Sequence, residues 1–233
     1  MGRRLADARA WMEAGTALML EAVSGLDEEQ FSRPSALPSW SRKHLVAHIS
    51  ANADALGNLI RWAATDEVTP MYASTERRNA DIYAGGSRSA VELADACAAS
   101  AARLQAAMDE LSDRQWTVEV LSAQGRRIPA ADIPWMRSRE VMIHAVDLRS
   151  GLTFRDLPPG FLAALCEDIV ITRGQAPGPA VRLEASDTGG QWSLGGDGDP
   201  VVATGPLCAI AAYLSGREAT GLSPGVPPLP PWL

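Results

Sequence analysis

The sequence predicts an N-terminal four-helix bundle followed by a smaller α+β domain. Four long segments before residue 152 have the composition, apolar spacing or end signals of helices, and the first and third of them are rich in Ala. After the turn-forming Pro158-Pro159-Gly160, one more helical segment gives way to short alternating runs, which are typical of strands. We therefore predict two domains, a bundle at residues 1–152 and an α+β domain at residues 153–233.

Residues that favour helix ends bound most of the predicted helices of the bundle. The four helices are expected at residues 3–23, 39–62, 89–111 and 132–148. Ser24-Gly25 follows the first helix, Ser39-Trp40-Ser41 opens the second, and Pro134 lies in the first turn of the fourth, where proline is tolerated. The residues between the second and third helices contain Pro70 and two adjacent glycines, so we predict a loop over 65–88.

The C-terminal domain is predicted to contain two helices and three short strands. The helices are expected at residues 161–172 and 207–214, and the strands at 181–184, 191–194 and 201–203. Glycine-rich turns separate these strands. A further short strand or extended connection is predicted for residues 118–121 of the first domain. The proline-rich residues 224–233 cannot form a helix.

Composition narrows the classes of function. The net charge of −7 argues against nonspecific nucleic-acid binding, which depends on neutralising phosphates. No uncharged stretch is long enough to cross a bilayer and the N-terminal residues do not resemble a signal peptide, so we expect a cytoplasmic protein. The three widely spaced cysteines, Cys97, Cys166 and Cys208, are interpreted as small buried apolar residues and not as metal ligands or nucleophiles.

The three histidines of the chain occupy two of the predicted helices. His44 and His48 are four residues apart, as are Glu140 and His144. Residues at this spacing lie one turn apart on the same face of a helix. One histidine of the first pair, with Glu140 and His144, would give a catalytic metal site with open coordination positions. The spacing does not choose between the first two histidines, and we favour His48 because it lies deeper in its helix, beside the apolar stripe.

The neighbours of the second pair favour a pocket over a solvent-exposed pair of side chains. Met136, Glu140, His144 and Leu148 form one row at fourfold spacing, with apolar residues at both ends. Asp147 follows His144 by three residues and is expected to orient it by a hydrogen bond. The alternative is a solvated Glu–His pair of the kind that many helices carry.

Two arginines and one asparagine complete the predicted site. Arg78 lies in the predicted loop, Arg217 follows the last predicted helix, and Asn52 lies one turn after His48. A guanidinium group binds a carboxylate in a fork and would offset the acidic charge of the protein locally. The alternative for Arg217 is a solvated residue or a contact with the last carbonyls of its helix. No nucleotide-binding loop, G-x-S-x-G or HExxH motif is present.

At these residues the chain resembles the mycothiol-dependent maleylpyruvate isomerases, relatives of the DinB-like four-helix metalloproteins. The matching stretches are residues 40–48, 69–72, 121–126 and 135–148, together with the closing residues 230–233. The resemblance implies zinc bound by His48, Glu140 and His144, and mycothiol as a thiol cofactor. It also implies that Arg78 and Arg217 take part in the site, and we expect both arginines and Asn52 to contact the cofactor.

The resemblance also implies a reaction. Maleylpyruvate is a dicarboxylate with a cis double bond; addition of a thiolate, rotation about the resulting single bond and elimination give fumarylpyruvate. Zinc would lower the pKa of the thiol, because the thiolate is the nucleophile. Two alternatives stay open at this point. One is a mycothiol S-transferase acting on another electrophile, and the other is a non-enzymatic module that senses zinc or a thiol through a closed fourth ligand.

Overall fold

The computed structural model describes residues 4–174 and 178–229. The chain divides into two compact units, Met1–Leu152 and Thr153–Leu233, which are described in turn. No helix in the described residues is long and apolar enough to cross a membrane.

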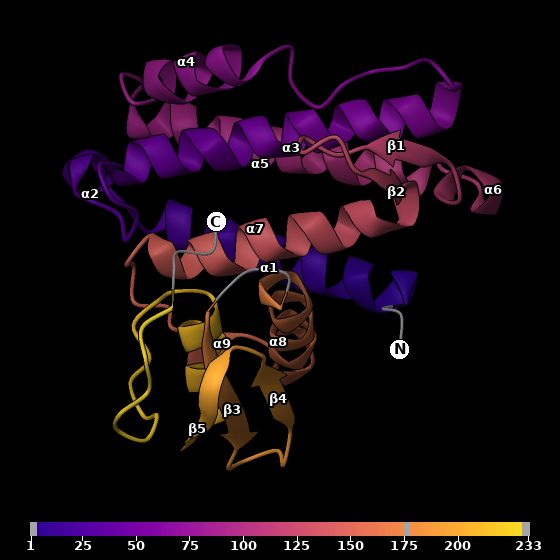
Figure 1. Cartoon of the computed structure of the whole chain (residues 1–233). Helices are drawn as coiled ribbons and strands as arrows, with labels where there is room; N and C mark the ends of the chain where they lie inside the picture. The colour runs from indigo at the N-terminus through magenta and orange to yellow at the C-terminus, as the bar shows by residue number, and fades with distance from the viewer. Residues whose placement is uncertain (1–3, 175–177, 230–233) are drawn as a thin grey trace. The chain divides into compact units, whose positions relative to one another are not determined.

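The first unit is a bundle of four long helices, whose arrangement Figure 1 shows. They are α1 (Leu5–Ser24), α3 (Arg42–Thr65), α5 (Ala90–Asp109) and α7 (Ile133–Asp147). Helix α1 packs against α7 and α5, and α3 packs against the same two helices. Short elements connect them: α2 (Glu28–Ser32), α6 (Asp113–Trp116), η1 (Ala130–Asp132), and an antiparallel hairpin of β1 (Glu119–Leu121) and β2 (Arg127–Pro129). The predicted fold class is confirmed.

Local sequence signals account for the start of the second long helix and for the packing of its inner face. The side chain of Ser41 caps the N-terminus of α3, and His44 returns a contact to the backbone of Ser41, which forms a capping box. The predicted apolar stripe of this helix lies in the core, with every member at most 1% exposed: Leu45, Ile49, Ala53, Leu56 and Ile60. The stripe fixes the rotation of α3 about its axis and hence the direction of its polar residues.

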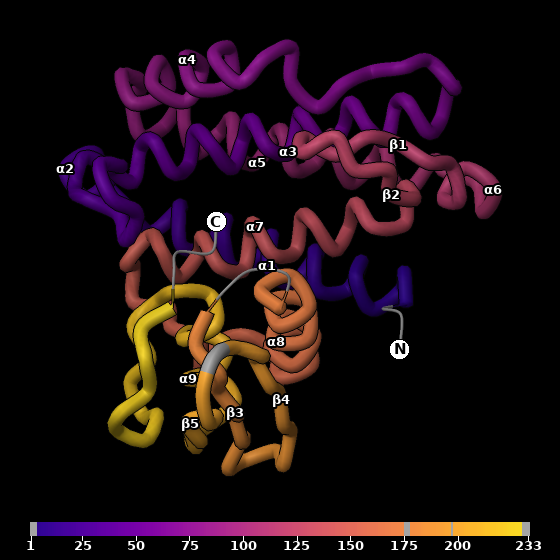
Figure 2. Tube along the Cα trace, in the orientation of Figure 1, coloured from indigo at the N-terminus to yellow at the C-terminus, as the bar shows by residue number. Residues whose placement is uncertain are grey.

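The loop predicted for residues 65–88 is wrong over about half its length. Residues Thr75–Gly85 form helix α4, which Ser74 caps by accepting a hydrogen bond from the backbone of Arg77. The chain runs back from the end of α3 so that α4 lies beside it (Figure 2). Only Ile82 and Gly85 of α4 are buried, so its sequence has no apolar stripe to reveal the helix. Packing against α3 stabilises this helix.

The second unit contains a three-stranded mixed sheet and two helices. Its elements are η2 (Phe154–Asp156), α8 (Pro159–Arg173), β3 (Pro179–Ala185), β4 (Gln191–Leu194), β5 (Asp197–Gly205) and α9 (Leu207–Leu214). Strand β3 lies in the centre, antiparallel to β4 and parallel to β5. Helix α8 packs against α9 and β4. All three predicted strands and both helices are present, and residues 230–233 lie outside the described residues.

Candidate metal centre

Three side chains from two helices meet inside the bundle. His48 projects from α3, and Glu140 and His144 project from α7. Glu140 Oε2 lies 3.0 Å from His48 Nε2 and 3.4 Å from His144 Nε2. One ligand atom from each residue lies within 4.8 Å of the other two, and both histidines are only 5% exposed. Two imidazoles and one carboxylate therefore converge on a point that a transition-metal ion fits.

A buried carboxylate holds His144 in place. Asp147 Oδ2 lies 2.8 Å from His144 Nδ1, and Asp147 is completely buried. The contact predicted from the three-residue spacing is therefore present. With Nδ1 donating to Asp147, the Nε2 atom of His144 faces Glu140 and is the nitrogen available to a metal. The backbone oxygen of Asp147 also accepts a hydrogen bond of 2.8 Å from the amide of Ala36, which fixes this end of α7.

His44 has a different role from His48. Its Nδ1 atom lies 2.8 Å from the hydroxyl of Ser41 and belongs to the capping box of α3. Its ring packs edge-on against Tyr83, with the ring centroids 5.6 Å apart. A Cβ added at Gly86 would come within 2.5 Å of His44 Nε2, so the imidazole occupies the space above that glycine. The structure thus brings His48, and not His44, to Glu140 and His144.

The protonation states of His48, Glu140 and His144 depend on one another. Burial disfavours the charged form of Glu140, but hydrogen bonds from His144 and His48 overcome it and hold the pKa of Glu140 well below its usual range. Burial likewise opposes protonation of His144, but its bonds to Asp147 and Glu140 raise its pKa to about 9. Burial lowers the pKa of His48. At neutral pH and without metal, the centre thus holds a carboxylate, an imidazolium and a neutral imidazole.

Arg78 lies beside this centre, on helix α4 and not in a loop as predicted. Its Nη2 atom is 3.4 Å from His48 Nδ1, and Nη1 donates to the side chain of Asn79 at 3.2 Å. The guanidinium group also lies over the ring of Tyr72, 5.6 Å from its centroid. The helix therefore carries a positive charge to the edge of the metal centre.

Sequence reasoning missed the role of Tyr72. Burial raises the pKa of this phenol, while the neighbouring side chains of Arg78 and Asn52 oppose the shift. The hydroxyl therefore lies among the residues that surround the metal centre. Tyr72 belongs to one of the stretches, residues 69–72, that carry the family resemblance, so a signal for it was present in the sequence.

Asn52 is buried one turn after His48, as its spacing requires. Its Oδ1 atom accepts a hydrogen bond of 2.8 Å from Nη1 of Arg137, a buried arginine of α7 that sequence reasoning also missed. The same Nη1 donates to the backbone oxygen of Ile49 at 2.8 Å. Asn52 therefore links the two helices that carry the metal ligands, and its contact with the cofactor stays a prediction.

Arg217 lies in the second unit, at the end of α9. Gly216 has the positive φ of +74° that the predicted turn needs, and the backbone amides of Gly216 and Arg217 bond to Tyr213 and Ala212 in a Schellman motif. Nη1 of Arg217 donates to the backbone oxygen of Ser215 at 2.6 Å. This is a contact with the last carbonyls of the helix, the alternative expected for Arg217 from the sequence.

The cysteines are unpaired, and two of the three are buried. Burial raises the pKa of Cys97 and raises that of Cys166 to about 12. A thiol with so high a pKa is a poor nucleophile at neutral pH, because only the thiolate reacts. Both sites agree with the interpretation of these cysteines as small apolar residues of the core.

The chain is similar to proteins of known family. A family model described as "Mycothiol maleylpyruvate isomerase N-terminal domain" matches residues 12–149. The crystal structure of a mycothiol-dependent maleylpyruvate isomerase is 38% identical, with a TM-score of 0.93, over 99% of this chain and 98% of that one. The chain belongs to the mycothiol maleylpyruvate isomerase family. A second crystal structure, of a histidine-to-alanine mutant of that isomerase, matches equally well. No curated protein sequence matches significantly.

A more distant likeness concerns the fold alone. YfiT from Bacillus subtilis, described as a probable metal-dependent hydrolase with an unusual four-helix bundle topology, is 15% identical. The match has a TM-score of 0.50 over 64% of this chain and 89% of that one. This chain therefore shares its bundle architecture with a protein of a different described activity, and the fold does not by itself fix the reaction.

Proposed function

We propose that this protein catalyses the mycothiol-dependent isomerisation of maleylpyruvate to fumarylpyruvate at a zinc site formed by His48, Glu140 and His144. The observation that carries the proposal is the convergence of these three side chains in a chain that belongs to the isomerase family. A dicarboxylate substrate and a low-molecular-weight thiol are its partners. We place the activity in the cytoplasm, because a reducing compartment keeps such thiols reduced.

The donor set of the centre suits zinc. Zinc accepts imidazole nitrogen and carboxylate oxygen, and catalytic zinc sites use three protein ligands and keep a position open. When bound, zinc would supply a Lewis acid that lowers the pKa of a thiol at neutral pH. Asp147 would keep Nδ1 of His144 protonated and leave Nε2 for the metal. His144 must lose its proton for the site to load.

The arginines have a separate role in this proposal. The protein carries a net charge of −7, so a substrate with two carboxylates needs cations at the site itself. Arg78 already lies 3.4 Å from His48, and its guanidinium would hold one carboxylate or the enolate that develops during thiol addition. We assign Arg217 to the other carboxylate, because a guanidinium group binds it in a fork. Asn52 would contact the thiol cofactor.

Whether mycothiol is regenerated or consumed distinguishes the isomerase from the S-transferase alternative. Purified protein is mixed with maleylpyruvate and with mycothiol at about one-twentieth of the substrate concentration, and substrate, product and free thiol are followed by absorbance and mass spectrometry. The proposal expects all the substrate to become fumarylpyruvate and the thiol to be recovered. Conversion that stops after one substrate per thiol, with a stable adduct, would instead indicate an S-transferase. Equal rates with and without thiol would contradict both.

A further inference from the structure

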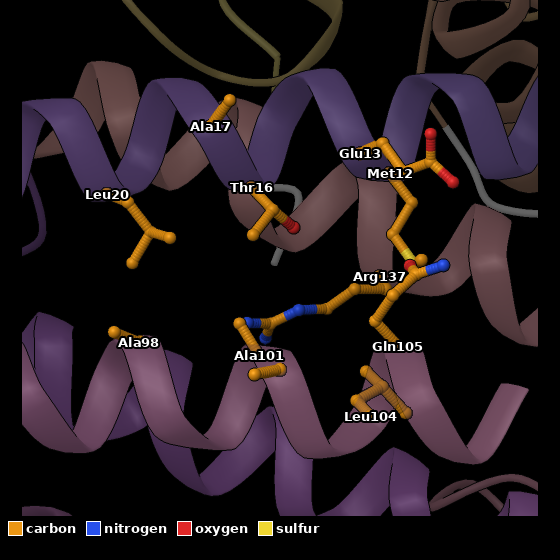
Figure 3. Close-up of a pocket in the computed structure, with 11 residues that line it drawn as sticks. Met12, Glu13, Thr16, Ala17, Leu20, Ala98, Ala101, Leu104, Gln105 and Arg137 are labelled. Atoms are coloured by element: carbon orange, nitrogen blue, oxygen red, sulfur yellow. The ribbon is translucent and has the colours of Figure 1, made fainter. Parts of the chain in front are cut away.

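The bundle contains a cavity that the metal centre does not use. It lies between α1 and α5, has a volume of about 400 Å³, and is partly open to solvent. Small side chains create it: Ala17 on α1 and Ala98, Ala101 and Ala102 on α5 keep the two helices from filling the space between them. Figure 3 shows this gap, with Met12, Leu20 and Leu104 among the apolar groups around it. Its volume is in the range of small-molecule sites.

A buried arginine forms the inner wall of this cavity. Arg137 reaches from α7 so that its guanidinium lies between α1 and α5 in Figure 3, and the residue is only 1% exposed. Its two hydrogen bonds to described residues both come from Nη1, to Ile49 and Asn52 on α3. Both acceptors are neutral, and no carboxylate of the described residues forms an ion pair with Arg137. Nε and Nη2 make no hydrogen bond to the described residues, and the carboxylates of Glu140 and Asp54 favour the charged form only through space, without forming an ion pair.

Such an arrangement is costly for the protein alone. A buried charge is disfavoured unless an opposite charge and hydrogen bonds compensate it. If Arg137 served only to link α7 to α3, a neutral donor would make the same two bonds without burying a charge. An anion entering from the cavity would compensate the charge and use the free donors. The hydroxyl of Thr16 faces the same gap and would add a further donor (Figure 3).

We propose that the cavity between α1 and α5 binds a small monocarboxylate with an apolar body, whose carboxylate pairs with Arg137. The apolar body would lie against Met12, Leu20 and Leu104. The carboxylate would accept from Nε and Nη2 in a bidentate pair, the geometry in which arginine binds this group most strongly.

The other charges of the cavity restrict the ligand class. Glu13 is an exposed lining residue, so a second carboxylate would meet a like charge instead of a cation. A cationic ligand would meet the buried Arg137. A neutral ligand would fill the apolar space but leave Arg137 without an ion-pair partner. The cavity therefore favours a ligand with one carboxylate over a ligand with two. The ligand thus differs from the dicarboxylate substrate proposed for the metal centre.

The test uses 2-naphthoate as the probe and 2-naphthalenemethanol as its neutral analogue. Binding of each to the full-length protein is measured by isothermal titration calorimetry and by saturation-transfer NMR. Ala98→Leu fills the cavity from an exposed helical position, and Ala99→Leu makes the same change at the adjacent exposed position, which does not line the cavity. Leucine favours the helix at both sites, so both variants are expected to fold.

The proposal expects 2-naphthoate to bind the wild type at least about ten times more tightly than the alcohol, because one partner is charged. Ala98→Leu should weaken binding at least about tenfold, and Ala99→Leu should leave it unchanged. Arg137→Met, if folded, should reduce the affinity for the acid to that for the alcohol. The proposal would be overturned if 2-naphthoate did not bind, or if the acid and the alcohol bound with equal affinity. It would also be overturned if Ala98→Leu and Ala99→Leu changed the affinity equally. Loss of 2-naphthoate binding in His48→Ala would also contradict the proposal, because it would show that the probe binds at the metal centre.

Discussion

At the scale of single residues, His144 is the most constrained group of the metal centre. Asp147 holds one ring nitrogen at 2.8 Å, and Glu140 lies 3.4 Å from the other. His48 completes the set from α3, while His44, one turn earlier, is bound to Ser41 at the helix start. The two histidines of α3 have the same spacing signal in the sequence, but different partners decide their roles.

We predict that His48→Ala, Glu140→Ala and His144→Ala each lose stoichiometric zinc, because each removes one of three ligands. His44→Ala should retain the metal. It should lower the free energy of unfolding by about 0.5–1 kcal/mol, since the capping box loses one member. Metal analysis of the dialysed variants, with urea unfolding of each, measures both effects. Full zinc in His48→Ala together with none in His44→Ala would reverse the assignment.

The metal-free protein should become less stable as the pH rises above neutral. The pKa of His144 is raised to about 9 in the folded chain, against about 6.5 when unfolded. Its stabilising contribution is therefore complete below about pH 6.5 and is lost as the pH rises through about 9, a change on the order of a few kcal/mol. Urea unfolding with a chelator at pH 7 and pH 9.5 measures the loss. His144→Gln should lose less stability between these two pH values than the wild type. An equal loss in the wild type and in His144→Gln would contradict the assignment of the effect to His144.

At the scale of elements, helix α4 brings Arg78 to the centre. It packs on α3 through glycine: a Cβ added at Gly85 would lie 2.3 Å from Cβ of Ala47. This close approach keeps α4 near enough for Arg78 to reach His48. The helix has little buried surface of its own, so the contact at Gly85 is important for its position.

We predict that Gly85→Ala lowers the free energy of unfolding by about 1–3 kcal/mol, because the added methyl group overpacks the contact with α3. Gly57→Ala is the matched control. It changes a glycine inside α3 whose added Cβ would meet nothing within 4 Å, and it should raise stability by about 0.5–1 kcal/mol. Urea unfolding of both variants gives the comparison. A stable Gly85→Ala protein would mean that α4 is not fixed by this contact.

The elements also show how far sequence reasoning reaches. Helices with a cap and an apolar stripe, such as α3, were predicted to within three residues at each end, because both signals are local. Helix α4 was missed because tertiary packing, and not its own pattern, stabilises it. The spacing of Glu140 and His144 predicted their convergence. Helix spacing could not predict the positions of Tyr72 and Arg137, because contacts between segments distant in sequence define them. For Tyr72 the signal in the sequence was its place in a stretch that carries the family resemblance.

At the scale of the whole molecule, the metal ligands all lie in the first unit, and the proposed function also uses the second. We predict that Arg217→Ala leaves zinc content and melting temperature nearly unchanged. Catalytic efficiency should fall roughly ten- to a hundredfold, since a charge-assisted hydrogen bond contributes about 1.5–3 kcal/mol. Arg217→Lys should restore activity only in part, because lysine lacks the fork. Steady-state kinetics of both variants measure the catalytic efficiency. Unchanged kinetics in Arg217→Ala would leave it as a helix-end residue that contacts Ser215.

The most direct test of the central claim is a titration of activity against metal. Metal-stripped protein receives zinc in steps, and the initial rate of maleylpyruvate isomerisation is measured at saturating mycothiol after each step. The proposed centre holds one ion, so the rate should rise linearly and level off at one zinc per chain, while His48→Ala should stay inactive throughout. Full activity before any zinc is added, or a rate that does not respond to zinc, would contradict catalysis at the His48–Glu140–His144 centre.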